Sequence, residues 1–220
     1  TSLDYDLQEQ VVCTTRIHLT RLEGNPIDEI SQDCPASRLL PATSIETSLP
    51  ELAANIIIYD PMQGNILAMA GEPVPGLDPT DSPGHPSGSL LSPLVYLSAF
   101  TRGFSPASLV WDIPDPEENL DNPDRQYHGP VRARLAMAND YLEPTIQLLQ
   151  QFGAETARQI SQQMGIDLNG DDRPYSELLF ESGEITLLQA VQSYGILANQ
   201  GLWVGQEAEK PTAPNRLEPL

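Results

Sequence analysis

The stretch that decides the fold covers residues 83–103 and reads PGHPSGSLLSPLVYLSAFTRG. A loop rich in proline, glycine and serine passes into an apolar run that predicts a buried helix over residues 89–102. Pro93 has no N–H, so it is tolerated only in the first turn of that helix, which places Ser89 at the helix N-terminus. Ser92 follows three residues later, nearly one helical turn, so the two serine side chains are predicted to share a face.

The composition limits the partners that the chain can have. It has 220 residues with 40% hydrophobic content, enough for a folded core, and a formal net charge of −20. That charge argues against nucleic acid, whose phosphates require clustered lysine and arginine, and against anionic membrane surfaces. The one lysine in the sequence is Lys210, so residues 1–209 offer no lysine for any chemistry.

The two cysteines, Cys13 and Cys34, leave two alternatives open. A disulfide between them would suit an extracytoplasmic protein and would contribute up to roughly 3 kcal/mol of stability. Two unpaired buried cysteines are equally compatible with the sequence. Their spacing matches no metal site.

A β-hairpin is the clearest strand signal. The runs NIIIY (residues 55–59) and NILAMA (residues 65–70) flank the turn sequence DPMQG. Pro61 suits the first turn position, and Gly64 can adopt the positive φ that closes such a hairpin.

Further helices follow from apolar periodicity and from their end signals. A Thr186–Gln189 capping box predicts the start of the last one, which ends near residues 199–201. Residues 106–130 are predicted to be a long acidic loop. Its carboxylates are spaced too irregularly for calcium. Residues 167–172 begin like an EF-hand loop but have Asp172 in place of its glycine and Leu178 in place of its last glutamate, so no metal and no cofactor is expected. The other predicted helices cover residues 6–23, 131–139, 144–152 and 154–164.

Five segments together resemble the transpeptidase domain of class A penicillin-binding proteins, within the penicillin-binding protein and serine β-lactamase-like superfamily, and they occur in that family's order. They are TSLDYDLQ (1–8), ANIIIYDPMQGNILAMAG (54–71), GSLLSPLVYLSAF (88–100), YHGPVRARLAMANDYLEPTI (127–146) and GEITLLQAVQSYGILANQG (183–201).

The resemblance implies an α/β fold of the α+β type, with a mostly antiparallel sheet and helices on both sides. We predict that residues 1–220 form one, partial, transpeptidase-like domain. Residues 202–220 are predicted to be a loop or tail leading towards C-terminal strands that this chain lacks. An exposed or borrowed sheet edge is therefore expected next to the hairpin.

The departures from the family lie at its catalytic motifs. The nucleophile–base motif SxxK reads Ser89-Leu-Leu-Ser92, so Ser89 marks a vestigial nucleophile position and Ser92 replaces the lysine. The SxN motif falls on Asp140-Tyr-Leu142, with Asp140 at the serine position and Leu142 at the asparagine position. The KTG motif is absent. Because a serine hydroxyl needs an adjacent base to act as a nucleophile, the resemblance predicts a domain without acyl-transfer activity.

The leading hypothesis is therefore a catalytically inactive pseudo-transpeptidase with a structural or interaction role in a cell-wall-associated, extracytoplasmic protein. Expected partners are peptidoglycan peptides, or another protein or chain that completes the sheet, with no nucleic acid. Contact with a membrane is expected only through a segment outside this chain. One alternative is a serine acyl-transferase or hydrolase in which His85 or His128 acts with Ser89 and Asp140. Another is a module that binds peptidoglycan peptides or protein.

Overall fold

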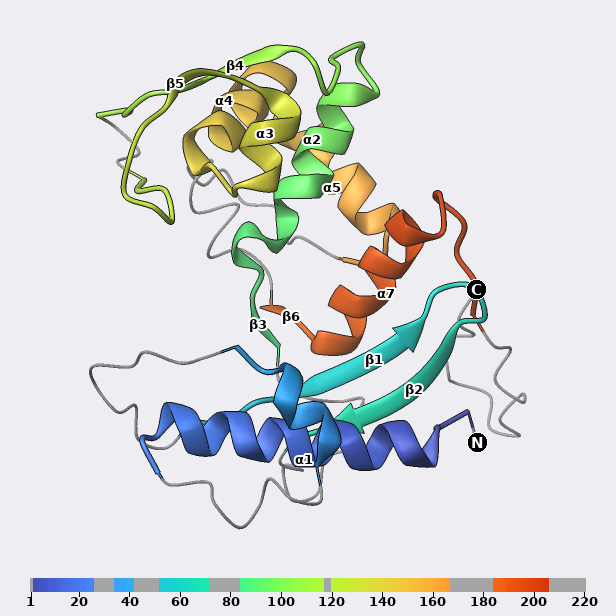
Figure 1. Ribbon diagram of the computed structural model, residues 1–220. Helices are drawn as coiled ribbons and strands as arrows, with labels where there is room; N and C mark the ends of the chain where they lie inside the picture. Colours follow the sequence, from blue (N-terminus) through green and yellow to red (C-terminus); the bar gives the residue numbers. More distant parts are fainter. Residues whose placement is uncertain are drawn as a thin grey trace. The chain divides into compact units, whose positions relative to one another are not determined.

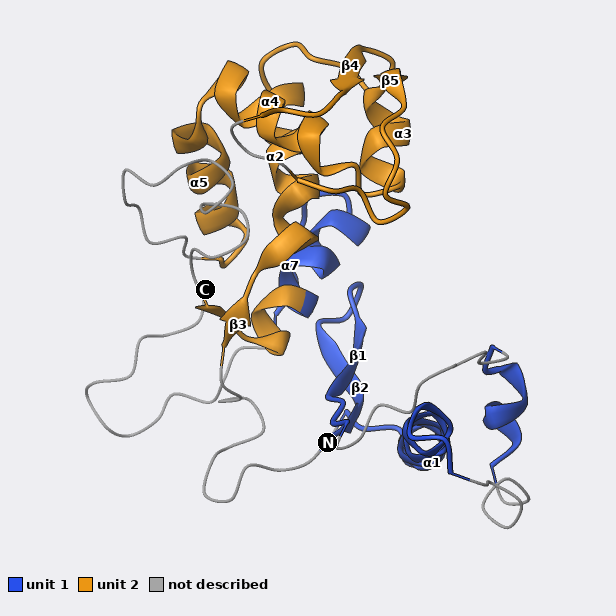
Figure 2. Ribbon diagram, turned by 90° about the vertical axis from the view of Figure 1, so that its left-hand side faces the viewer, with its two compact units in different colours: residues 1–82, 191–220 blue, residues 83–190 orange. Residues whose placement is uncertain are grey.

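A computed structural model describes residues 2–25, 34–41, 52–71, 84–116, 120–166 and 184–205 (Figure 1). The chain divides into two compact units, one formed by residues 1–82 with 191–220 and the other by residues 83–190 (Figure 2). Across the described residues, helices combine with three two-stranded antiparallel sheets. This confirms the predicted mixture of helices with antiparallel strands.

The first unit is built on helix α1 (Tyr5–Leu22) and a hairpin. The Asp4 side chain caps α1 by accepting a hydrogen bond from the Leu7 N–H. The Gln8 side chain then fastens α1 to strand β2 (Asn65–Ala70), because its amide oxygen accepts from the Met69 N–H and its amide nitrogen donates to the Met69 carbonyl.

Strand β1 (Ile56–Asp60) pairs with β2 in antiparallel register, as the sequence predicts. The Asp60 carboxylate accepts hydrogen bonds from the N–H groups of Met62 and Gln63, and Gly64 adopts a φ of +70°. A side chain at Gly64 would also collide with the backbone of Val204, at 2.7 Å. The Tyr59 hydroxyl donates to the carbonyl of the same Val204, so the hairpin also anchors residues after the last helix.

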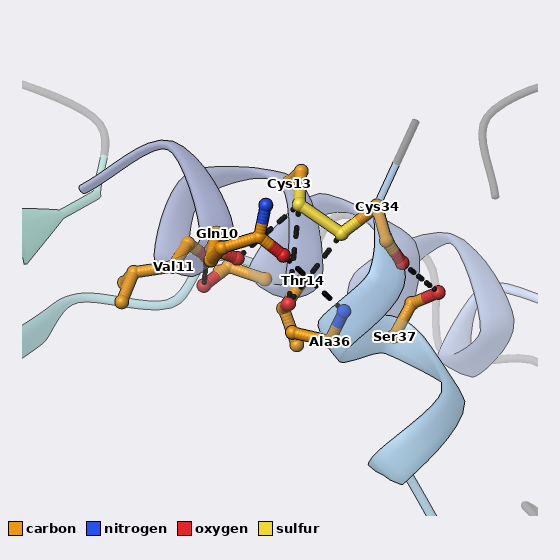
Figure 3. The surroundings of a disulfide bond; sticks show 8 residues. Gln10, Val11, Cys13, Thr14, Cys34, Ala36 and Ser37 are labelled. Carbon is orange, nitrogen blue, oxygen red and sulfur yellow. Dashed lines mark hydrogen bonds between the residues drawn. A yellow bond between two sulfur atoms is a disulfide. The ribbon is translucent and has the colours of Figure 1, made fainter. Parts of the chain in front are cut away.

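A disulfide joins Cys13 to Cys34 and so decides between the two alternatives that the sequence left open (Figure 3). It ties α1 to the short helix η1 (Pro35–Leu39). The Gln10 side chain supports the same junction by accepting a hydrogen bond from the Ala36 N–H. The covalent link therefore replaces part of the apolar packing that so short a helix cannot supply.

The second unit is organised around helix α2 (Ser92–Phe100), which packs against the helices that follow it. Its Leu94, Tyr96 and Ala99 side chains are fully buried. The predicted helix over residues 89–102 begins instead as a 3₁₀ turn, η3 (Gly88–Leu91). The unit also contains β3 (His85–Pro86), β4 (Leu109–Asp112), β5 (Gly129–Arg132), α3 (Ala133–Ala138), α4 (Leu142–Phe152), α5 (Ala154–Gln163) and β6 (Glu184–Ile185).

Strands β4 and β5 correct two sequence-based predictions. All of β4 and the first two residues of β5 lie in the stretch 106–130, which the sequence analysis predicts to be loop throughout. Strand β5 also takes the first residues of the helix predicted over residues 131–139, so α3 begins later. Helix α7 (Leu187–Ala198) leads from the second unit back into the first, and the Thr186 and Gln189 side chains form the predicted capping box at its start.

Candidate functional site

The structure places Ser89 and Ser92 on either side of the junction between η3 and α2. Ser89 is partly exposed within η3, while Ser92 is the first residue of α2 and is 4% exposed. The Ser92 N–H donates to the Ser89 carbonyl. Among the described residues, the Ser92 hydroxyl has no hydrogen-bond partner. The position three residues after Ser89 therefore holds a buried, neutral group that cannot take up a proton from a nucleophile at neutral pH.

Asp140 occupies a position defined by the backbone. Its φ is +54°, the left-handed conformation that aspartate tolerates better than most residues. The Tyr141 N–H donates to the Ala136 carbonyl, and the Asp140 N–H donates to the Met137 carbonyl. This pair of bonds is the Schellman motif, and it ends helix α3 with Asp140 at its left-handed residue. Asp140, which the sequence analysis predicts to stand at the family's serine position, thus has a structural role as a helix cap.

Leu142 begins helix α4, where its side chain is half-buried. Its N–H donates to the Asn122 side-chain oxygen at 3.1 Å, which satisfies one of the free donors at the start of the helix. The apolar Leu142 side chain has no amide with which to bind a polar substrate group.

Tyr96 lies on the same helix as Ser92 and belongs to the core of the second unit. It lies one helical turn after Ser92 and is fully buried, and burial is the main cause that raises the pKa of its hydroxyl. Thr145 opposes this shift, although the two hydroxyls make no hydrogen bond of normal geometry. The carboxylates of Asp140 and Asp112 raise the pKa further. The Tyr96 hydroxyl therefore stays neutral at neutral pH. The Ser92 hydroxyl is neutral as well, so neither side chain places a charge in the part of α2 that follows Ser89.

The second unit also contains a network of hydrogen-bonded polar side chains that the sequence analysis did not predict. Asp112, on β4, is completely buried. Its carboxylate accepts hydrogen bonds from the Asn122 amide at 2.9 Å to each oxygen, from the His128 N–H at 2.8 Å and from His128 Nδ1 at 2.9 Å. A buried carboxylate is tolerated only with such partners. We call Asp112, Asn122, His128 and Tyr141 the polar clamp.

Tyr141 completes the polar clamp by stacking on His128, with ring centroids 4.4 Å apart and planes inclined by 9°. His128 Nε2 lies 3.2 Å from the Asp124 carboxylate and 3.3 Å from the Tyr141 hydroxyl. Burial, followed by Asp124 and Asp112, raises the pKa of the Tyr141 hydroxyl. The clamp thereby fastens residues 120–128 to the N-terminus of α4, where the Leu120 N–H also donates to Glu143.

The histidines considered as alternative bases have other roles in the structure. Both ring nitrogens of His128 face clamp partners or Asp124, and His85 is exposed on β3, where its backbone pairs with Ile185. The sequence around Asp112 reads LVWDIP (residues 109–114) and has no alternation of apolar and polar residues that would have indicated the clamp. Neither Asn122 nor Tyr141 carried a recognisable motif.

The described residues contain no group of three histidine, cysteine, aspartate or glutamate side chains placed to hold a metal ion. In the same part of the chain, no helix is both long enough and apolar enough to cross a membrane. Lys210 and the carboxylates of residues 167–172 lie outside the described residues.

Comparison with known proteins finds relatives among the penicillin-binding proteins, although no family model matches. Penicillin-binding protein 1B of Vibrio cholerae is 32% identical over 170 residues, covering 71% of this chain and 22% of the relative. Penicillin-binding protein 1A of Escherichia coli is 25% identical over 171 residues, covering 71% of this chain and 20% of the relative. The chain thus spans about a fifth of the length of these relatives.

Among solved structures, the penicillin-binding protein PonA1 of Mycobacterium tuberculosis matches 93% of this chain and 51% of its own, with a TM-score of 0.66 at 15% sequence identity. At that identity the match shows a shared fold. The structural and sequence comparisons therefore agree on the same group of proteins.

Proposed function

We propose that this chain, which is a distant homologue of the transpeptidase region of class A penicillin-binding proteins, is a pseudo-transpeptidase domain that has kept the scaffold and lost acyl transfer. The observation that carries the proposal is the replacement of the expected base by Ser92. Its hydroxyl is buried without a hydrogen-bond partner among the described residues, which contain no lysine.

The chemistry of acyl transfer explains why this replacement matters. A serine hydroxyl is a poor nucleophile at neutral pH unless a neighbouring base removes its proton. Removing one member of a cooperating catalytic set lowers the rate by about 10⁴- to 10⁶-fold. Here Asp140 and Leu142 also depart from the family's pattern, and Asp140 would bring negative charge where an oxyanion needs hydrogen-bond donors.

The role that remains is structural or interactive, in a cell-wall-associated protein. The relatives and the Cys13–Cys34 disulfide support an extracytoplasmic location, since disulfides persist in oxidising compartments. In the described residues, β1 and β2 pair only with each other. We propose that further strands extend this pair into a mostly antiparallel sheet with helices on both sides. Another chain or peptidoglycan peptides are the proposed partners.

Labelling with a fluorescent penicillin tests the loss of acyl transfer. PonA1, which has been solved in complex with penicillin V, serves as the positive control. We expect no covalent label on this chain under conditions that label PonA1 fully, and no difference between the wild type and Ser89→Ala. Stoichiometric labelling that disappears in Ser89→Ala would overturn the proposal.

Turnover of a p-nitrophenyl ester tests the rearranged-base alternative. Since both ring nitrogens of His128 already have partners and His85 is exposed on β3, we expect no turnover above the background of the Ser89→Ala variant. Activity that is lost in Ser89→Ala and in either His85→Ala or His128→Ala would instead identify a hydrolase. Calorimetric titration with muropeptides then separates a peptidoglycan-binding role from a purely structural one.

A further inference from the structure

One face of the β4–β5 sheet is open to solvent and carries two large apolar side chains. The register pairs Leu109 with Arg132 and Trp111 with Pro130, and all four residues are exposed. Leu109 is 62% exposed and Trp111 is 54% exposed. Because side chains at alternate strand positions point to the same side, these four share one face. We call them the outer face.

The opposite face of the same sheet is already occupied. Val110, Asp112 and Val131 are buried there, and β4 packs against α3 and α4. The β4–β5 sheet is therefore held in place by its inner face, and Leu109 and Trp111 do not contribute to that packing. Single apolar residues scattered over a protein surface are normal, but Leu109 and Trp111 are neighbours on one face, and grouped exposed apolar side chains are found at interaction sites.

The outer face carries one positive charge although the chain as a whole is acidic. The sequence has 31 acidic and 11 basic residues, yet Arg132 is exposed and takes part in none of the ion pairs among the described residues. The Arg132 guanidinium donates to the Ala107 carbonyl at 3.2 Å, which holds it next to Leu109. An arginine held in this way can donate hydrogen bonds to a carboxylate with little further loss of side-chain entropy.

We propose that the outer face docks an acidic segment of another protein. A large apolar side chain of that segment would pack on Leu109 and Trp111, and a neighbouring carboxylate would pair with Arg132. A short segment brings only a few negative charges, which local pairing can neutralise. A second copy of this chain would bring a further net charge of −20, and nucleic acid or an anionic membrane would be repelled in the same way.

The outer face includes none of Ser89, Ser92 and Asp140, so the proposal stands whether or not the chain transfers acyl groups. Tryptophan and arginine are the residues most enriched among interface positions that dominate binding energy. Removing either anchor is therefore expected to weaken binding at least about tenfold.

Selection of a random dodecapeptide display library on the intact chain supplies a probe of the outer face. We expect enriched peptides to carry aspartate or glutamate beside a large apolar residue. Fluorescence anisotropy of a selected peptide should show at least tenfold weaker binding to Trp111→Ala and to Arg132→Glu. Leu109→Glu serves as a third variant, and circular dichroism of each variant checks the fold.

Matched controls lie in the first unit, where Trp203 is 47% exposed and Arg16 is exposed on α1. Trp203→Ala and Arg16→Glu should leave the affinity within about twofold. No enriched peptide, enrichment of basic or neutral peptides, or equal effects of control and outer-face variants would each overturn the proposal. Sedimentation that reveals a dimer abolished by Trp111→Ala would assign the face to a second copy and would also overturn it.

Discussion

Replacing Asn122 by alanine tests whether the polar clamp holds the second unit together. Asn122 is 2% exposed, and its amide nitrogen donates to both oxygens of Asp112 and to the Gln126 carbonyl at 2.7 Å. Its side-chain oxygen also accepts the Leu142 N–H. The alanine variant removes all of these bonds and leaves the Asp112 carboxylate with His128 as its only donor residue among those the structure describes.

The expected cost follows from the kinds of bond that are lost. A hydrogen bond to a charged group is worth about 1.5–3 kcal/mol, and one between neutral groups about 0.5–1.5 kcal/mol. The contact with the first N–H of α4 adds about 1 kcal/mol, as helix capping does. The two contacts to Asp112 come from one amide nitrogen and are counted as one charged bond. Together these give a loss of about 3–5.5 kcal/mol in the free energy of unfolding, a large part of the stability of a typical domain.

Urea unfolding followed by tryptophan fluorescence measures this loss in the intact chain. The two tryptophans lie in different units, so Trp111 reports on the second unit alone in a Trp203→Phe background. Asn139→Ala is the matched control, because Asn139 is exposed and donates only to the Leu135 carbonyl. The control should cost less than about 1 kcal/mol. A loss of less than about 1 kcal/mol in Asn122→Ala, or one equal to the control, would refute the assignment of the clamp.

Three further predictions address other parts of the structure. Asp140→Gly should stabilise the second unit by about 0.5–1 kcal/mol in thermal unfolding, because glycine adopts the left-handed cap conformation without strain. Asp140→Asn is the control that separates the effect of the lost charge. A loss of stability in Asp140→Gly would contradict the Schellman assignment. The raised pKa of Tyr96 means that the folded state keeps a proton that the unfolded chain releases, so stability should fall above about pH 10. In Tyr96→Phe that decline should be smaller by about 1.4 kcal/mol per pH unit, and an unchanged slope would exclude Tyr96 as its source. Replacing Cys13 and Cys34 together by alanine should cost the first unit about 3 kcal/mol, for a sequence separation of 21, measured by Trp203 fluorescence; an unchanged midpoint would show that the disulfide adds nothing.

Features that depend on residues close together in the chain could be predicted from the sequence. The hairpin of β1 and β2, the glycine that closes it, and the capping box at the start of α7 all depend on contacts within a few positions, and all were confirmed. The resemblance to penicillin-binding proteins was equally accessible, because it rests on the order of short motifs, and the relatives confirmed it. The start of α2 was misjudged, since a 3₁₀ turn and an α-helix share the same residue preferences there.

The tertiary structure decided the features that join distant residues. Asp112 is hydrogen-bonded to Asn122 and His128, which lie 10 and 16 positions later in the chain, and no local sequence pattern predicts such contacts. The pairing of β4 with β5 was hidden for the same reason, because an acidic loop separates the two strands. The sequence determined that Ser92 stands where a lysine was expected. Only the structure showed that the Ser92 hydroxyl is buried without a partner among the described residues, and that Asp140 caps a helix, because burial and backbone conformation depend on what packs around them.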